Sequence, residues 1–394
     1  MLSRVFRSAI NDSRLLGILV PGAVVLATGS VVIGRAMIAR RDAWLLGDWM
    51  IDYSAGFTRR GLIGEAIRQV AAALGIDRIV MTGVIIWLVF ASVVFVVTAL
   101  FLYQYRGFTT VLLLVSPAFL FFFLNVLGTM RKELLLFLLI GVVLLATKIT
   151  RRGEWAWLLP VLFPVLVFAH EGLAFYGLFV LIIFFLLVSD GLLSQKQAMA
   201  QGSAMVFLTA FAGWVLIRLG DSAGIDQRIC DNLVSEGYST RLCGGAIAFL
   251  DRTTPEAIDR VAGLVATNNY LSTYAVAIAL AAVPFIFVRF SRTALALLFM
   301  AAIVTAPLFV VAIDWGRWIA ISVWIVTMIT VRFDGTRHIR LQRLNPKTLM
   351  IDLLAIVGIV LYATLWSLPH CCEPRIGFGL IDRFADVLTI LGRG

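Results

Sequence analysis

The chain has 394 residues, of which 61% are hydrophobic and only 14% are charged, and its mean hydropathy is +0.98. Soluble domains carry roughly 25% charged residues, so this composition excludes a soluble globular protein and indicates a chain that crosses a membrane many times. The formal net charge of +10 favours contact with anionic lipid. The basic residues form no aromatic-interleaved surface apart from the apolar segments, so the sequence predicts no binding to nucleic acid.

Apolar runs recur along most of the sequence. Counting runs of roughly 17–25 residues, and accepting a few shorter ones, predicts an all-α polytopic membrane protein with about eleven spans. The predicted spans are 15–38, 80–103, 108–127, 133–149, 156–170, 172–189, 203–219, 269–289, 293–313, 317–332 and 348–368. The stretch 156–189 is too long for one span, and His170, Glu171 and Gly172 in its middle mark the predicted break.

The segments between alternate spans are rich in arginine and lysine. The richest, between the last two spans, contains Arg332, Arg337, Arg340, Arg343 and Lys347. Such residues mark the cytoplasmic side of a bacterial inner membrane, which predicts a cytoplasmic N-terminus. The whole chain, 1–394, then forms a single transmembrane domain. Its two large loops, 39–79 and 220–268, and its C-terminal tail, 369–394, are predicted to face the periplasm.

Arginines also occur in the first of these outside loops, which conflicts with a simple count of cytoplasmic positive charge. Two of them, Arg40 and Arg41, directly follow the first span. They are interpreted either as residues at the level of the lipid headgroups or as residues that meet an anionic ligand.

Cysteine usage agrees with the predicted orientation, because all four cysteines lie in outside segments. Cys230 and Cys243 lie in the loop 220–268, where an oxidising periplasm predicts a disulfide between them. Cys371 and Cys372 are adjacent in the tail and either form a vicinal bridge or stay reduced. Their spacing fits no zinc pattern, so the sequence predicts no metal site.

The outside segments contain helical patterns of their own. Apolar residues recur at helical spacing from Leu62 to Leu74, which predicts an amphipathic helix in the membrane interface. Thr254 is a predicted cap for a short helix that opens at Pro255. A further interfacial helix is predicted over 379–391.

Four clusters of charge follow the first, third, fifth and ninth predicted spans, so all four fall on the same side of the membrane. They consist of Asp52, Arg59 and Arg60; Arg131, Lys132 and Glu133; His170 and Glu171; and Asp314 and Arg317. Charge at the edge of a bilayer is costly unless it lines a wet cavity or binds a polar ligand. The pattern therefore predicts one composite site, framed by helices and open to the outside.

The cations of these clusters suit a phosphate or diphosphate carried on a lipid. The arginine fork binds two phosphate oxygens at once and stays charged at any relevant pH. Arg131 and Lys132 precede a span whose helix N-terminus adds positive potential, and Arg317 opens another span in the same way. The alternative for each cation is a side chain that merely reaches the interface.

The acids of the clusters are interpreted as catalytic groups or as ion-pair partners. Asp52, beside Tyr53, is either a general base or the ion-pair partner of Arg59 or Arg60. Glu171 adjoins His170 in the middle of an apolar stretch, a setting that suits acid–base chemistry. Glu133 and Asp314 are expected to pair with neighbouring arginines. The tryptophans expected either to stack on sugar rings or simply to sit at the interface are Trp44, Trp49, Trp315 and Trp318.

The acid-bearing first outside loop, the interfacial helix and the many spans resemble the GT-C fold of lipid-dependent glycosyltransferases. Within that group the chain is similar to the Wzy/EpsG-type bacterial polysaccharide polymerases, which make O-antigen and exopolysaccharide. The residues that carry this resemblance are Arg131-Lys132-Glu133, His170-Glu171, Asp314-Trp315-Gly316-Arg317 and the loop from Asp48 to Gly64. The chain departs from the polymerase pattern at Glu171, where a small or hydroxyl residue is expected.

The resemblance implies a reaction between two lipid-linked glycans. A polyprenyl-diphosphate-linked glycan is the donor, a second one is the acceptor, and the lipid diphosphate leaves. The implied catalytic residues are Asp52, His170 and Glu171. The implied substrate-binding residues are Asp48, Tyr53, Arg59, Arg60, Arg131, Lys132, Asp314, Arg317 and Trp318. No cofactor is implied, and the expected partners are the lipid-linked donor, the glycan acceptor and membrane lipids.

Other functions fit the same features. A GT-C transferase that adds a single sugar from a polyprenyl-phosphate donor differs only in its substrate. A flippase for the lipid-linked glycan would place charges near the bilayer midplane in paired halves, whereas here they gather at one edge. A membrane acyltransferase with His170 as its base lacks a recognisable donor site.

Overall fold

The computed structural model describes residues 13–104, 108–124, 130–220, 223–288, 292–333 and 346–370, with a few isolated positions of the C-terminal tail. The protein is a polytopic helical membrane protein. In the described ranges, eight helices are long and apolar enough to cross a membrane. They are Gly17–Ala39, Arg78–Tyr103, Glu133–Thr150, Glu171–Ser189, Gln195–Leu219, Tyr270–Phe287, Arg292–Val311 and Trp315–Phe333.

Three predicted spans take other forms. The span 108–127 consists of two short helices, α6 (Phe108–Leu114) and α7 (Pro117–Leu124). They separate because Pro117 has no N–H to donate and disfavours a helical conformation at Ser116. The span 156–170 is the short helix α9 (Leu158–Ala169), and the last span overlaps α18 (Pro346–Thr364). The count of eleven spans stays a prediction.

The described core of the bundle is built around α17 (Trp315–Phe333). Its span is 78% buried, compared with 17% for the span that begins with α15 (Arg292–Thr305). Trp324 in the middle of α17 is fully buried, and its ring stacks on Phe137 of α8 (Glu133–Thr150) at 4.2 Å. On the other side of α8, α5 (Arg78–Tyr103) packs against α2 (Ser13–Ala39).

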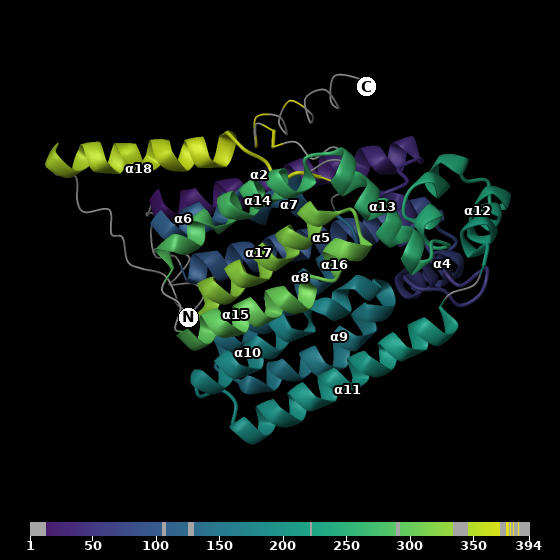
Figure 1. Cartoon of the computed structure of the whole chain (residues 1–394), viewed down its shortest axis with the longest axis horizontal. Helices are drawn as coiled ribbons and strands as arrows, with labels where there is room; N and C mark the ends of the chain where they lie inside the picture. The colour runs from purple at the N-terminus through teal and green to yellow at the C-terminus, as the bar shows by residue number, and fades with distance from the viewer. Residues whose placement is uncertain are drawn as a thin grey trace.

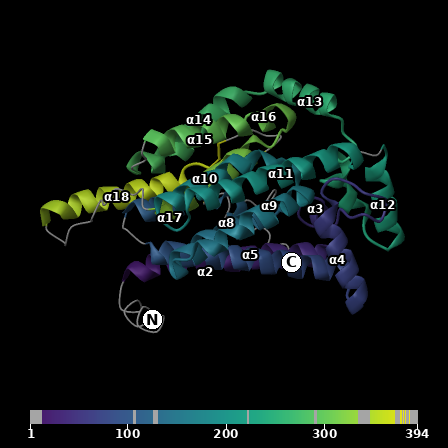
Figure 2. The ribbon, with the colours of Figure 1, turned by 90° about the horizontal axis from the view of Figure 1, so that it is seen from below.

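The helices form layers, seen edge-on in Figure 2. The segment 254–311 supplies a separate layer with α13 (Thr254–Thr267), α14 (Tyr270–Ala282), α15 and α16 (Leu308–Val311). It faces a middle layer that contains α9, α10 (Gly177–Ser189) and α11 (Gln195–Leu219). The segments 39–79 and 220–268 keep the name outside loops after their predicted side, and their short helices gather at one end of the bundle (Figure 1). This arrangement lets loop residues cover the helix ends that carry the charge clusters.

The first outside segment contains α3 (Leu45–Trp49) and α4 (Gly61–Leu74). The predicted helix over 62–74 is thus confirmed. The helix α4 packs so closely on the loop before it that a Cβ at Gly64 would lie 1.9 Å from the carbonyl oxygen of Ile51. The short α3 is buried along its whole length, with Trp49 donating its indole N–H to the carbonyl of Met130 at 2.8 Å.

The second outside segment contains α12 (Ile225–Ser235), two short 3₁₀ helices and α13. The predicted Cys230–Cys243 disulfide is present and ties α12 to the segment after it. The cap of α13 is Thr253, so the prediction of Thr254 was wrong by one residue. The Thr253 N–H donates to the Glu256 carboxylate at 2.9 Å, which fixes the first turn one residue earlier.

Some predictions fall on parts of the chain that the structure does not describe. They concern Cys371 and Cys372, most of the helix expected over 379–391, and the basic loop 334–345.

Candidate functional site

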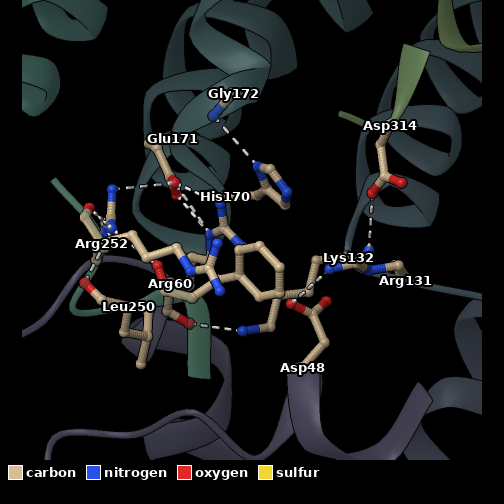
Figure 3. Close-up of polar contacts among 12 residues, drawn as sticks. Asp48, Arg60, Arg131, Lys132, His170, Glu171, Gly172, Leu250, Arg252 and Asp314 are labelled. Carbon is tan, nitrogen blue, oxygen red and sulfur yellow. Dashed lines mark hydrogen bonds and ion pairs between the residues drawn. The ribbon is translucent and has the colours of Figure 1, made fainter. Parts of the chain in front are cut away.

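The four charge clusters meet at one end of the bundle, as the sequence predicted. Arg59 and Arg60 come from the loop before α4, and Glu133 is the first residue of α8. His170 and Glu171 lie at the break between α9 and the 3₁₀ helix Glu171–Tyr176, where His170 is extended (φ −160°, ψ 109°). Figure 3 shows Arg60 and Glu171 pointing toward one another with His170 beside them, Asp48 below and Asp314 to one side.

A cavity of about 580 Å³ lies over this cluster. We call it the arginine cavity, because six of its lining residues are Arg59, Arg60, Arg131, Arg252, Arg260 and Arg317. His170, Glu171, Asp314 and Trp318 also line it. The rest of the wall is largely apolar and comes from α9, α11 and α16, with Val167, Leu216, Ile217, Leu308 and Val311. The cavity therefore combines cationic side chains with an apolar wall. We call the part lined by Arg131 and Arg317 the floor and the part lined by Arg252 and Arg260 the roof.

Arg60 and Glu171 form the closest ion pair of the described cavity lining. Arg60 Nε donates to Glu171 Oε2 at 2.9 Å, and Arg60 Nη2 donates to Oε1 at 2.6 Å. Arg60 is held in place through its backbone, because Lys132 Nζ donates to its carbonyl at 2.6 Å. Its φ of 66° lies in the left-handed region, which places the turn that starts α4. Lys132 thus positions Arg60 from behind the cavity wall.

Arg59 connects the two outside segments. Its Nη2 donates to the carbonyl oxygens of Phe249 at 3.1 Å, Leu250 at 2.9 Å and Arg252 at 3.1 Å. Its Nη1 lies 4.0 Å from Glu171 Oε1. The loop 220–268 is therefore fastened to the first outside loop directly beside the cavity.

Arg131 lines the cavity between two carboxylates. Its Nη2 is 3.7 Å from Asp48 Oδ1, its Nη1 is 3.5 Å from Asp314 Oδ2, and its guanidinium lies over the Trp44 ring at 5.2 Å. Asp48 is fully buried. Burial alone would raise the pKa of Asp48, but the nearby charges of Arg131 and Lys132 hold that pKa well below its usual range. Asp48 is therefore an ionised anchor for Arg131.

Asp314 pairs with its neighbour Arg317 at 3.1 Å, as expected, whereas Glu133 lies 3.4 Å from the same arginine of another cluster. His170 Nε2 faces Glu133 Oε1 at 3.5 Å, and His170 Nδ1 accepts the Gly172 N–H at 3.2 Å. A neutral imidazole that accepts at Nδ1 carries its proton on Nε2. Both ring nitrogens of His170 are thus directed at protein groups in this geometry.

Two of the four singled-out tryptophans line the cavity, Trp44 and Trp318. Trp318 lies edge-on to His170 at 6.0 Å, and the Arg317 guanidinium lies 4.5 Å from its ring centre. Trp49 is buried away from the cavity, and Trp315 packs on Tyr270 at 5.4 Å.

Asp52 and Tyr53 do not line the cavity. Asp52 is 1% exposed, and its partner is Arg78, not Arg59 or Arg60 as the sequence suggested. Arg78 is the first residue of α5 and also donates to the Met50 carbonyl at 2.6 Å. Asp52 therefore faces the buried side of the loop, where Arg78 lies. Ser54 donates to the same carboxylate from its N–H at 2.9 Å and its hydroxyl at 2.6 Å. Tyr53 stacks on Phe57.

Two arginines of the cavity, Arg252 and Arg260, were not predicted as site residues from the sequence. Both lie over the Phe249 ring, at 4.3 Å and 5.7 Å from its centre. Among the residues described, neither has an acidic partner within ion-pair distance. For Arg260 the available signal was its helical spacing from Ala257 and the cap residue Thr253, which puts all three on the side of α13 that lines the cavity.

Within the described ranges no three His, Cys, Asp or Glu side chains are grouped so that they could hold a metal ion. No family model, curated protein or solved structure gives a significant match to the chain. The function is therefore inferred from the geometry of the arginine cavity and of the charges around it.

Proposed function

We propose that this protein is a glycan polymerase of the bacterial inner membrane, which uses polyprenyl-diphosphate-linked glycans at the periplasmic face. One observation carries the proposal: six arginines and an apolar helical wall surround one cavity of about 580 Å³. A diphosphate attached to a long hydrocarbon chain needs both kinds of surface next to each other.

The cations are suited to a diphosphate. Arg252 and Arg260 approach the cavity from the roof without an acidic partner among the described residues, and Arg59 is fixed by carbonyl oxygens. Guanidinium groups bind phosphate oxygens in pairs and stabilise the charge that develops on a departing diphosphate. Arg131 and Arg317 belong to the buried pairs with Asp48, Asp314 and Glu133, so they set the potential of the floor.

The apolar wall is suited to the lipid. Leu216 and Ile217 of α11 and Leu308 and Val311 of α16 line the cavity. The span of α11 is only 22% buried within the protein. A prenyl chain next to it would therefore pass directly from the cavity into the bilayer.

Glu171 is the proposed general base. Its side chain is 28% exposed toward the cavity and is held by Arg60. A bound diphosphate competes with Glu171 for Arg60 and so frees the carboxylate next to the reacting sugar. The acceptor hydroxyl oxygen then bonds to the donor C1, the bond from C1 to the phosphate oxygen breaks and its electron pair leaves with the lipid diphosphate, and Glu171 takes the hydroxyl proton. Asp52, which lies outside the cavity, is assigned a structural role.

The test uses the full chain, purified and reconstituted in lipid, with a polyprenyl-diphosphate oligosaccharide pool. Product length is followed on a gel for wild type, Glu171→Gln and Arg60→Ala, with Asp52→Asn as the matched acid outside the cavity. We expect a ladder with wild type and Asp52→Asn, and none with the two cavity variants.

Three results would replace the proposal. A single added sugar, seen only with a polyprenyl-phosphate donor, would identify the simple transferase. Movement of the lipid-linked glycan between leaflets without a new product would identify a flippase. A ladder from Glu171→Gln at the wild-type rate would remove Glu171 as the base.

A further inference from the structure

A second cavity lies at the C-terminal end of α2 and shares no lining residue with the arginine cavity. It has a volume of about 400 Å³ and is lined by Arg40, Arg41 and Arg241 together with residues 237–239. We call it the α2 cavity. Its volume lies within the range of roughly 300–1,000 Å³ that is typical of small-ligand sites. The proposed polymerase chemistry makes no use of it.

One side of the α2 cavity is held in place by Arg40. Its N–H closes the last turn of α2 on the Ala36 carbonyl at 2.9 Å, and its φ of 53° turns the chain away from the helix. Its guanidinium donates to Asp77 at 2.6 Å and lies 5.9 Å from the centre of the Tyr238 ring. Asp77 therefore balances the charge of Arg40 and fixes this side of the cavity.

The other side comes from the loop after α12. Gly237 has a φ of 88°, and its N–H and that of Tyr238 donate to the carbonyls of Val234 and Leu233, which ends α12 in a tight turn. The 3₁₀ helix Thr240–Gly244 then presents Arg241 to the cavity. The disulfide at Cys243 holds this segment against α12. The rim is thus set by backbone turns and a covalent bond.

Arg41 and Arg241 are exposed, and no acidic partner for either occurs among the residues that the structure describes. Because Asp77 balances Arg40, these two arginines supply the net positive charge of the cavity. Two guanidinium groups at one opening favour an anion with several oxygens, and phosphate has the matching geometry.

The α2 cavity also lies at the depth where a lipid headgroup would lie. The candidate span Gly17–Ala39 ends at the cavity, and the last apolar side chain before it, Ile38, is 83% exposed. Toward the N-terminal end of the same helix, Leu19, Val20 and Val24 are exposed as well. An apolar helix face therefore runs away from the phosphate-binding groups along the expected direction of the acyl chains.

We propose that the α2 cavity binds the phosphate headgroup of an anionic phospholipid, with Arg41 and Arg241 on the phosphate and the acyl chains along α2. The bound lipid bridges the first span and the disulfide-tied loop. This site is independent of the polymerase assignment, because it shares no residue with the arginine cavity.

The experiment titrates the purified full chain in neutral detergent with phosphatidylglycerol or phosphatidylcholine, and reads bound lipid by native mass spectrometry. Inorganic phosphate is added in a third series. We expect phosphatidylglycerol to bind more tightly than phosphatidylcholine. Arg41→Gln combined with Arg241→Gln should weaken phosphatidylglycerol binding about tenfold or more, because both charge-assisted contacts to the phosphate are removed.

The matched control is Arg152→Gln combined with Lys196→Gln. It removes the same charge from exposed positions at the far ends of α8 and α11, and binding should stay at the wild-type level. Arg41→Lys with Arg241→Lys keeps the charge but not the fork, so it should bind between wild type and the glutamine pair. This lysine variant can still be measured if the double glutamine variant does not fold.

Three outcomes would overturn the proposal. Equal binding of the two lipids would mean that charge is not recognised. An equal loss in the control would mean that only net charge matters. Displacement of phosphatidylglycerol by inorganic phosphate at equal concentration would identify a site for a free anion rather than for a lipid.

Discussion

Arg60 and Glu171 are 111 positions apart in the chain, yet the Arg60 guanidinium donates to both carboxylate oxygens of Glu171. The pair joins the first outside loop to the break between two membrane helices. Since Lys132 holds Arg60 from behind, the carboxylate is the partner that can be exchanged. An arriving phosphate can therefore take over Arg60 while the loop stays in place.

Substitution of Glu171, alone and together with Arg60, should show that the pair contributes to stability and to activity in different ways. Glu171→Gln leaves the Arg60 charge without its partner, and we expect a loss of about 2 kcal/mol in unfolding free energy. This is below the roughly 3–5 kcal/mol of a fully buried pair, because water reaches both side chains. Arg60→Gln combined with Glu171→Gln should regain stability but no transfer activity. Thermal unfolding and the chain-length assay measure the two properties, and an active double variant would contradict the assigned roles.

Substitution of the roof arginines should weaken substrate binding without unfolding the protein. Arg252→Gln or Arg260→Gln removes charged donors to the diphosphate, each worth about 1.5 kcal/mol, or about tenfold in Kd. The readout is equilibrium binding of a polyprenyl diphosphate. Arg218→Gln is the matched control, since Arg218 is exposed on α11 near the cavity but does not line it. An equal effect at Arg218 would show that the arginines act only through net charge.

Asp52→Asn should affect stability and not the reaction. Its buried ion pair with Arg78 joins the first outside loop to the start of α5, and its loss should lower the unfolding free energy by about 3 kcal/mol. Arg78→Gln should cost at least as much, because it breaks the same pair and also removes the donor to the Met50 carbonyl. Turnover per folded molecule should remain near wild type. A stable but inactive Asp52→Asn protein would restore Asp52 as a catalytic residue.

Acid should weaken the helix α4 through Glu65. Arg68, through its hydrogen bonds at 3.0 Å and 2.6 Å, lowers the pKa of Glu65 from 4.5 to about 2. Because the folded-state pKa lies below the ordinary value, this stabilisation is complete above pH 4.5 and disappears as the pH falls toward about 2. Its size should be about 1 kcal/mol, as expected for a partly exposed pair.

Thermal unfolding of wild type and Glu65→Gln over pH measures this contribution. The difference in Tm should be constant above about pH 5.5 and should shrink below the ordinary glutamate pKa, as the carboxylate becomes protonated. A difference that persists unchanged at about pH 2.5 would mean that Glu65 acts through packing and not through its charge.

Much of the fold follows from local sequence patterns. Length and hydropathy located the long spans, and the polar pair His170 and Glu171 located the break between α9 and the next span. The amphipathic pattern of 62–74 located α4. The break at Pro117 was missed because the apolar run continues through it. Hydropathy reports the environment of a segment, whereas proline acts on the backbone.

The site was predictable in outline and not in its pairings. Charge clusters that share one side of the membrane must be close in a compact bundle, so the meeting of Arg60, Arg131 and Glu171 followed from topology. The partner of Asp52 depended on which way the loop faces, and spacing does not determine that. Arg252 enters the cavity through the folding of a polar loop, for which the sequence carries no periodic signal.

The three carbonyl oxygens around Arg59 have a consequence for the kinetics of binding. The carbonyl groups fix Nη2 in one orientation and carry no net charge of their own, while Glu171 lies 4.0 Å from Nη1. The rotamer entropy of Arg59 is thus lost during folding and not during binding. We therefore expect this arginine to act as a preorganised receptor, so that affinity for an anion is gained mainly through slow dissociation.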